Sequence, residues 1–354
     1  KNIEKNEINF LLKKENLNID ISIVENEIND LRYEDVEYPE CNSGWCIVNV
    51  KYSGICSSDV PRILKKGTYK FPTIPGHEFS GVVCQVADKE NENLIGKHVG
   101  VFPLIPCKKC EQCMEGNYEM CSHYDYIGSR RDGGFAEYVA VPIWNLVELP
   151  SEIDLKEAAM MEPLAVALHA VKQANINYEK KVAVVGTGLI AFAIAQWAKL
   201  LGAKEVVVLG RSEEKRRIAE EVLELKYEMT ADFKDEFDVV FEAVGSNQAI
   251  NQAINYTNAG GNLVLMGNPE GDIQLSQNTY WRILRKQIKI IGSWNSSYEY
   301  RKTCDWTEVK EALANKDIIV EQLITHLMSK EELKNGLDIM YNHKEPYCKI
   351  MIFW

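Results

Sequence analysis

Residues 181–210, KVAVVGTGLIAFAIAQWAKLLGAKEVVVLG, decide the fold of this chain. A strand-like run, VAVV, leads into the turn GTGLIA, and an apolar helical stretch and a second strand-like run follow. This is the strand–turn–helix setting in which the pattern G-x-G-x-x-G/A binds a dinucleotide. The first glycine allows the tight turn, the second lets the backbone approach the pyrophosphate, and the helix N-terminus favours its negative charge. The residues expected at the cofactor are Gly186, Gly188, Leu189 and Ile190.

The end of the second strand bears on which dinucleotide is bound. NAD-dependent relatives of this fold carry an acidic residue there that accepts hydrogen bonds from the ribose, whereas this chain has Gly210, Arg211 and Ser212. An arginine beside a hydroxyl can hold a 2′-phosphate, so Arg211 and Ser212 favour NADP over NAD. The alternative is that Arg211 is a solvated surface charge and that Glu213 or Glu214 reaches the ribose.

The same alternation of strand and helix continues through DVVFEAVG, NLVLMG and IKIIGSW. We therefore expect a Rossmann domain, a doubly wound parallel sheet that binds the dinucleotide, over residues 166–299. Residues 21–165 show short β-like runs broken by Gly and Pro, and they predict a mostly-β domain that residues 300–354 complete. Residues 1–20 are expected to form a polar N-terminal extension, too weakly apolar for a secretory signal.

Length and composition limit the class of protein. The chain has 354 residues, more than one core usually supports, which agrees with two domains. Its formal net charge of −12 argues against nucleic acid as a partner, since a phosphate backbone would be repelled. No apolar run approaches the roughly 18 residues of a membrane span. We expect a cytoplasmic protein that acts on a small molecule.

Four cysteines crowd into the segment CKKCEQCMEGNYEMC with the spacing C-x2-C-x2-C-x7-C. Four thiolates in one short loop can close a tetrahedral site around a structural zinc ion. Iron–sulfur ligation uses an overlapping spacing and is the nearest alternative, followed by unliganded thiols. The predicted structural zinc ligands are Cys107, Cys110, Cys113 and Cys121.

A second group of metal-ligand residue types is spread along the chain. Cys56 lies in GICSSD, His77 and Glu78 follow in PGHEFSG, and Glu162 lies in MEP. Soft, borderline and hard ligands together are typical of a zinc site that keeps one position open for water or substrate. Singly, each residue has a structural explanation, because a lone buried Cys is usually a small hydrophobe. Their joint occurrence around the four-cysteine segment indicates a catalytic metal site.

The order of these motifs carries a family resemblance. GICSSD, PGHEFSG, the four-cysteine segment, GGFAEYV, MEP and GTGLIA follow one another as in the zinc-containing medium-chain dehydrogenase/reductase family. The resemblance covers the chain from about residue 28, and it is strongest to the polyol and polyol-phosphate dehydrogenases. It implies a GroES-like catalytic domain beside the Rossmann domain, two zinc ions per subunit, and a homodimer or homotetramer with a contact near NLVLMG.

The resemblance also implies roles for individual residues. Cys56, His77 and Glu162 would bind the catalytic zinc, with Glu78 either as an alternate ligand or as a carboxylate that supports the ligands without binding zinc. Ser58 matches the family's proton-relay hydroxyl, and Asp59 matches the carboxylate that orients His77. The implied reaction is hydride transfer between a secondary alcohol of the substrate and NAD(P).

A phosphorylated substrate needs a cationic side chain that binds its phosphate group. The candidates are Arg62, Arg130, Arg131, Arg282 and Arg285. Arginine suits phosphate, although surface arginines are mostly solvated or paired with carboxylates. Three other functions stay open: a zinc-dependent NADP(H) reductase of unphosphorylated alcohols or ketones, an enzyme of pentitol 5-phosphates, and a non-catalytic NADP-binding zinc protein.

Overall fold

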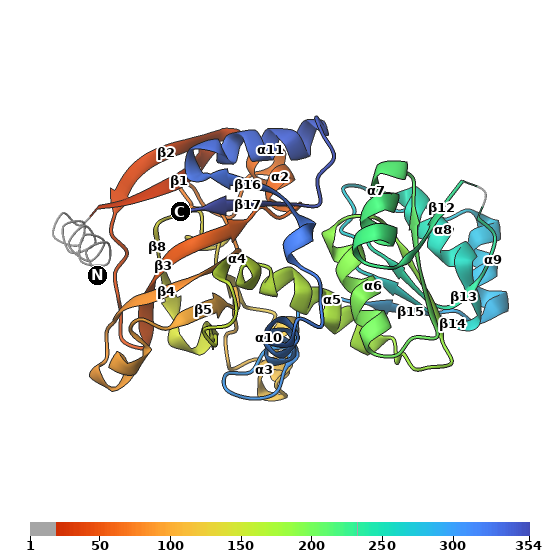
Figure 1. Cartoon of the computed structure of the whole chain (residues 1–354), viewed down its shortest axis with the longest axis horizontal. Helices are drawn as coiled ribbons and strands as arrows, with labels where there is room; N and C mark the ends of the chain where they lie inside the picture. Colours follow the sequence, from red (N-terminus) through yellow and green to blue (C-terminus); the bar gives the residue numbers. More distant parts are fainter. Residues whose placement is uncertain (1–18, 232) are drawn as a thin grey trace. The chain divides into compact units, whose positions relative to one another are not determined.

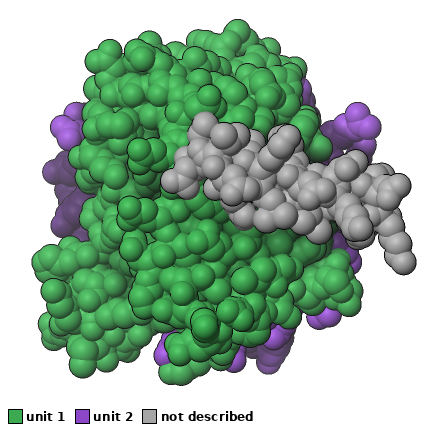
Figure 2. Space-filling model, turned by 90° about the vertical axis from the view of Figure 1, so that its left-hand side faces the viewer, with its two compact units in different colours: residues 1–162, 300–302, 324–354 green, residues 163–299, 303–323 purple. Residues whose placement is uncertain are grey.

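The computed structural model describes residues 19–231 and 233–354. These residues form two compact units, which Figure 2 shows in different colours. Unit 1 runs to Glu162 and adds residues 300–302 and 324–354, whereas unit 2 consists of residues 163–299 and 303–323. No helix of the described residues is long and apolar enough to cross a membrane.

Residues 303–323 belong to unit 2 and not to the first domain, where the sequence pattern predicts them. They include helix α10, Asp305–Asn315. The buried carboxylate of Asp305 lies 2.9 Å from the Nδ1 of His169 and accepts a hydrogen bond from Lys172, also at 2.9 Å. Both partners lie on helix α5, Met161–Gln173, so a buried polar contact ties α10 to this unit.

Unit 2 is built on a six-stranded sheet in which every neighbouring pair is parallel (Figure 1). Its strands are β10 Lys181–Val185, β11 Glu205–Gly210, β12 Lys226–Met229, β13 Phe237–Glu242, β14 Thr257–Leu265 and β15 Lys289–Gly292. Its helices, besides α5 and α10, are α6 Leu189–Leu200, α7 Glu213–Arg217, the π-helical turn Ile218–Val222, α8 Asn247–Tyr256 and α9 Gln277–Lys286. The order β12-β11-β10-β13-β14-β15 reverses direction at β10, which confirms the predicted Rossmann fold.

The strand order does not fit an extension of the sheet across a dimer at NLVLMG itself. These residues lie in and directly after β14, which is hydrogen-bonded to β13 on one side and to β15 on the other. A strand paired on both sides has no free edge to extend across a dimer. The free edge on this side of the sheet is β15, the last strand in the order.

Unit 1 is mostly β, as predicted. Its seven-stranded sheet has the order β16-β17-β3-β4-β5-β9, with β8 also paired to β3. The strands of the unit are β1 Ile19–Glu27, β2 Asp30–Glu37, β3 Trp45–Gly54, β4 Glu78–Val86, β5 His98–Val101, β6 Leu104–Ile105, β7 Asp125–Tyr126, β8 Tyr138–Pro142, β9 Leu146–Glu148, β16 Ile324–Ser329 and β17 Lys349–Phe353. Its helices are α2 Asp59–Pro61, the π-helical turn Arg62–Lys66, α3 Glu111–Met114, α4 Leu155–Ala158, α11 Leu333–Asn342 and the 3₁₀ turns Lys89–Leu94, Tyr118–Met120, Ile143–Asn145 and Lys330–Glu332.

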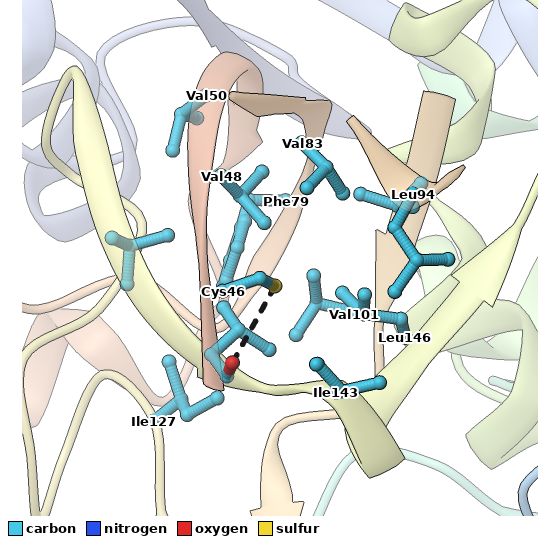
Figure 3. Close-up of a cluster of buried hydrophobic side chains, with 13 residues drawn as sticks. Cys46, Val48, Val50, Phe79, Val83, Leu94, Val101, Ile127, Ile143 and Leu146 are labelled. Carbon is cyan, nitrogen blue, oxygen red and sulfur yellow. Dashed lines mark hydrogen bonds between the residues drawn. The ribbon is translucent and has the colours of Figure 1, made fainter. Parts of the chain in front are cut away.

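One hydrophobic core of unit 1 lies against strands β3 and β4 (Figure 3). Alternate residues of β3, Cys46, Val48 and Val50, point into it and are at most 1% exposed. Cys46 also donates a hydrogen bond through Sγ to the carbonyl of Val141, at 3.5 Å, the dashed line in Figure 3. The intervening residues Ile47 and Asn49 are buried as well, at 0% and 9% exposed, so this part of β3 is covered on both faces.

The structure revises the expected N-terminal extension and places the C-terminal strand in a sheet. Residues 1–18 of the expected N-terminal extension lie outside the described residues, and Ile19 and Asp20 belong to β1 rather than to an extension. At the other end, β17 pairs antiparallel with β3 and parallel with β16. The last strand is therefore part of the sheet that carries the candidate active site.

Candidate active site

The pairing of β3 with β4 brings the first metal-ligand candidates together. Gly54, the last residue of β3, lies opposite Glu78, the first residue of β4, in the antiparallel ladder. Cys56 follows this end of β3 and His77 precedes Glu78, so both lie at the same end of the sheet. The ligand atoms of Cys56, His77 and Glu78 all lie within 4.8 Å of one another. Such a mixed set of sulfur, nitrogen and oxygen donors fits a zinc ion.

Asp59 supports this group from helix α2. Its fully buried carboxylate accepts a hydrogen bond from the backbone N–H of Cys56 at 3.1 Å and forms an ion pair with Arg62 at 2.9 Å. Its Oδ1 lies 3.4 Å from the Nδ1 of His77, which has no hydrogen-bond partner among the described residues, so the orienting role of Asp59 stays a prediction. Burial alone would raise the pKa of Asp59, but the neighbouring His77 and Arg62 outweigh it and the pKa is lowered.

Ser58 lies directly beside Cys56. Its hydroxyl donates a hydrogen bond to the Sγ of Cys56 at 3.3 Å, and the side chain is half-buried. A hydroxyl that touches a candidate ligand and also approaches the surface of its unit can pass a proton outward.

The two candidate carboxylates have different partners. Glu78 is 1% exposed and receives a hydrogen bond from Lys349, which is 4% exposed and also donates to the carbonyl of Ile55 at 3.1 Å. Glu162 is not among the three residues within 4.8 Å, and it accepts a hydrogen bond from the hydroxyl of Tyr126 at 3.3 Å. Burial raises the pKa of Glu162 to about 7.

Sequence reasoning missed both of these partners. Lys349 is remote in sequence from the site, and it arrives because β17 pairs with β3. Its one sequence signal is a lysine in the otherwise apolar run YCKIMIFW. Tyr126, whose ring centroid lies 5.8 Å from that of His77, has no distinguishing signal among 16 tyrosines.

The four-cysteine segment forms a compact group. All four Sγ atoms lie within 4.8 Å of one another, with 4.0 Å between Cys107 and Cys113 and 3.9 Å between Cys110 and Cys121. Four sulfurs about 2.3 Å from one central ion would be about 3.8 Å apart. The group therefore fits a single tetrahedral ion and favours zinc over a cluster of several iron atoms.

The dinucleotide fingerprint has the expected geometry. Gly186 has φ of +130°, a conformation that side chains disfavour, and Gly188 is the N-cap residue of α6. Leu189 and Ile190 then form the first turn of that helix.

At the end of β11, the backbone of Gly210 runs close to two neighbours. A Cβ at this position would lie 2.0 Å from the hydroxyl oxygen of Tyr227 and 2.5 Å from the side chain of Thr187. The Tyr227 hydroxyl donates to the carbonyl of Ser212 at 2.7 Å, while Arg211 is exposed. The packing thus leaves no room for an acidic side chain at residue 210.

A mostly-β unit with candidate metal sites and a Rossmann unit with a dinucleotide fingerprint are together typical of two-domain dehydrogenases. The family model described as alcohol dehydrogenase GroES-like domain matches residues 42–151, and the one described as zinc-binding dehydrogenase matches residues 186–311. The chain therefore belongs to the zinc-containing medium-chain dehydrogenase/reductase family, as a zinc-dependent dehydrogenase of the alcohol and polyol type.

Three similar proteins illustrate the range of relatives of this chain. The galactitol 1-phosphate 5-dehydrogenase of Escherichia coli (strain K12) is 34% identical over 307 residues, covering 83% of this chain and 89% of the relative. The structure of a zinc-binding dehydrogenase from Sinorhizobium meliloti 1021 bound to NADP has a TM-score of 0.85 and 26% identity, over 95% of this chain and 99% of that chain. An alcohol dehydrogenase from E. coli CFT073 in complex with NADH has a TM-score of 0.86 and 25% identity, over 95% of this chain and 100% of that chain. Solved neighbours thus include complexes with either cofactor.

Proposed function

We propose that the protein oxidises a secondary alcohol of a polyol phosphate, similar to galactitol 1-phosphate, to the ketone and transfers the hydride to NADP. The observation that carries this proposal is the group of Cys56, His77 and Glu78 with the hydroxyl of Ser58 hydrogen-bonded to it. A binding protein would need the metal ligands but no proton-transfer group beside them. The choice of a polyol phosphate is supported by the 34% identity to galactitol 1-phosphate 5-dehydrogenase.

The catalytic roles follow from the contacts of each side chain. Cys56 and His77, with Glu162 or Glu78 as the carboxylate ligand, would hold zinc, which supplies Lewis-acid chemistry at the alcohol oxygen when bound. Ser58 accepts the proton that the alcohol loses and passes it toward solvent. Asp59 holds the Cys56 backbone in place.

The proposal of NADP rests on the end of β11. Gly210 is required there by the approach of the Tyr227 hydroxyl, so the carboxylate that would repel a 2′-phosphate has no place. Arg211 is exposed at the following position, with Ser212 beside it, and together they can bind the phosphate. Glu213 forms an ion pair with Arg216 at 2.6 Å, which makes it less suited to contact a ribose.

We propose further that each subunit carries two zinc ions, the second held by the four cysteines, and that the subunits form a homodimer or homotetramer. The free edge of β15 supports an oligomer, since Ile290 on this strand is 46% exposed. A cytoplasmic location stays a prediction.

The test of the proposed function is hydride transfer by zinc-replete protein, followed at the absorbance of the reduced nicotinamide. Galactitol 1-phosphate and free galactitol are compared, each with NAD and with NADP. We expect turnover with the phosphate ester and NADP, and a loss of about 10²- to 10⁴-fold in kcat for Ser58→Ala with unchanged metal content. Ser57→Ala is the matched control, because Ser57 is exposed beside it. Equal rates with the free polyol would contradict the phosphate ester, and an unaffected S58A enzyme would contradict the role of Ser58.

A further inference from the structure

The side chain of Arg130 is held in an unusual setting within unit 1. Its guanidinium lies over two tyrosine rings, 4.6 Å from the centroid of Tyr69 and 4.1 Å from that of Tyr124. One terminal nitrogen donates to the carbonyl of Tyr124 at 2.6 Å. The Nε is buried, and none of the described residues accepts a hydrogen bond from it. The arginine is thus positioned firmly while part of its donor capacity is unused.

The other arginines considered for a phosphate are already occupied or exposed. Three of them are paired with carboxylates, as Arg62–Asp59, Arg131–Asp125 and Arg282–Glu236. Arg285 is exposed and lies 4.8 Å over the ring of Trp281. Arg130 is partly buried, and no carboxylate in the described part of the chain lies within ion-pair distance of it. An uncompensated, partly buried charge is costly unless an anion balances it.

A row of aromatic rings connects Arg130 to the candidate metal ligands. The ring of Tyr124 lies 6.1 Å from that of Tyr126, which in turn lies 5.8 Å from that of His77. The hydroxyl of Tyr126 donates to Glu162. All these residues belong to unit 1, so the row is a property of that unit alone. A polyol bound by one hydroxyl at the His77 end would extend its other end along this row.

We infer that Arg130 is the subsite for the phosphate group of the substrate, an inference that rests on the proposed function. The two tyrosine rings and the carbonyl of Tyr124 hold the guanidinium, and its remaining N–H donors suit the oxygens of a phosphate monoester. These contacts position the arginine before the substrate arrives, so little side-chain entropy is lost on binding. The negative charge of the phosphate group compensates the positive charge of Arg130.

The test replaces Arg130 by methionine, which can pack against the tyrosine rings without donating hydrogen bonds. Arg131→Met is the matched control, because its guanidinium is on the same loop but paired with Asp125. Because R130M loses charged hydrogen bonds to the phosphate group, we expect its KM for galactitol 1-phosphate to rise about 10- to 100-fold. The kcat with this ester, and both constants with free galactitol, should stay within about threefold of the unmutated enzyme.

A merely structural role of Arg130 would give a different pattern. Equal losses with the ester and the free polyol, or a fall in kcat at unchanged KM, would overturn the inference, as would an ester KM that R131M raises as much as R130M. Inorganic phosphate serves as a second probe: it should inhibit the unmutated enzyme and R131M but not R130M. If the unmutated enzyme shows no preference for the ester, the proposed substrate fails. The subsite is then supported if phosphate inhibition is lost in R130M and refuted if inhibition is absent or unchanged.

Discussion

Replacing Lys349 by methionine should destabilise unit 1 strongly. Lys349 is 4% exposed and Glu78 is 1% exposed, and the lysine donates both to Glu78 and to the carbonyl of Ile55. Removing one partner of such a pair leaves a buried carboxylate without compensation, which costs about 3–5 kcal/mol. Proteins are stable by only about 5–15 kcal/mol, so a large share of the stability would be lost.

The free energy of opening of unit 1 is best measured by hydrogen exchange of the β3 and β17 amides in metal-free protein, since a two-domain chain need not unfold in one step. The double variant Glu78→Gln, Lys349→Met should recover a large part of the loss, because neither charge then remains. Lys344→Met is the matched control: Lys344 and its partner Asp338 have side chains 54% and 39% exposed, and such surface pairs contribute at most about 1 kcal/mol. A K349M cost below about 1 kcal/mol, or full additivity in the double variant, would refute the reasoning.

Three further outcomes are expected. Cys110→Ser should lower the zinc content by one equivalent per subunit in elemental analysis while leaving the second equivalent; retention of both would exclude the four-cysteine site. Arg211→Ser should lower kcat/KM for NADP about 10- to 100-fold in steady-state assays and leave NAD unchanged, whereas equal losses would remove Arg211 from the ribose phosphate. Glu25→Gln should raise the apparent Tm more at pH 8 than at pH 5, because burial raises the pKa of Glu25 to about 7, against the opposing effect of Arg62. The folded state then keeps a proton that the unfolded chain releases near pH 4.5, so this group's contribution to stability falls as pH rises from about 4.5 to 7; equal Tm shifts at both pH values would contradict this.

Sequence predicts best those sites whose residues lie close together along the chain. GTGLIA occupies one turn between β10 and α6, and four cysteines within fifteen residues need only a short loop to converge. Cys56 and His77 are farther apart, yet short motifs marked both as candidates and the structure brings them together. Their convergence depends on one antiparallel pairing, that of β3 with β4.

The parts that sequence reasoning missed depend on long-range strand order. Lys349 reaches Glu78 only because β17, at the end of the chain, pairs with β3. The expectation that the sheet is extended near NLVLMG has a similar cause, since the apolar run of β14 resembles that of β15 and only the sheet order shows which strand lies at the edge. Periodicity identifies strands but does not order them.

The charges around the candidate metal site can be assigned pair by pair. Asp59 is compensated by Arg62, with 2.9 Å between the charged atoms. Glu78 is compensated by Lys349, and both side chains are almost fully buried. These two pairs are formed within unit 1 alone, so they keep two carboxylates neutralised whether or not a metal ion is bound.

What remains at the site is the thiol of Cys56, the carboxyl of Glu162 and the imidazole of His77. If the first two are ionised and the third is neutral, their total charge is −2, which one divalent cation balances. Recruiting Glu78 instead would weaken its pair with Lys349 and leave the buried lysine with only the neutral carbonyl of Ile55 as a partner, at a cost of several kcal/mol. This argument supports Glu162 as the carboxylate ligand, although Glu78 lies nearer to Cys56 and His77 in the structure. Lys349→Met tests this argument. Without the lysine, Glu78 is free to compete for the metal, and zinc should bind more tightly to K349M than to the unmutated protein.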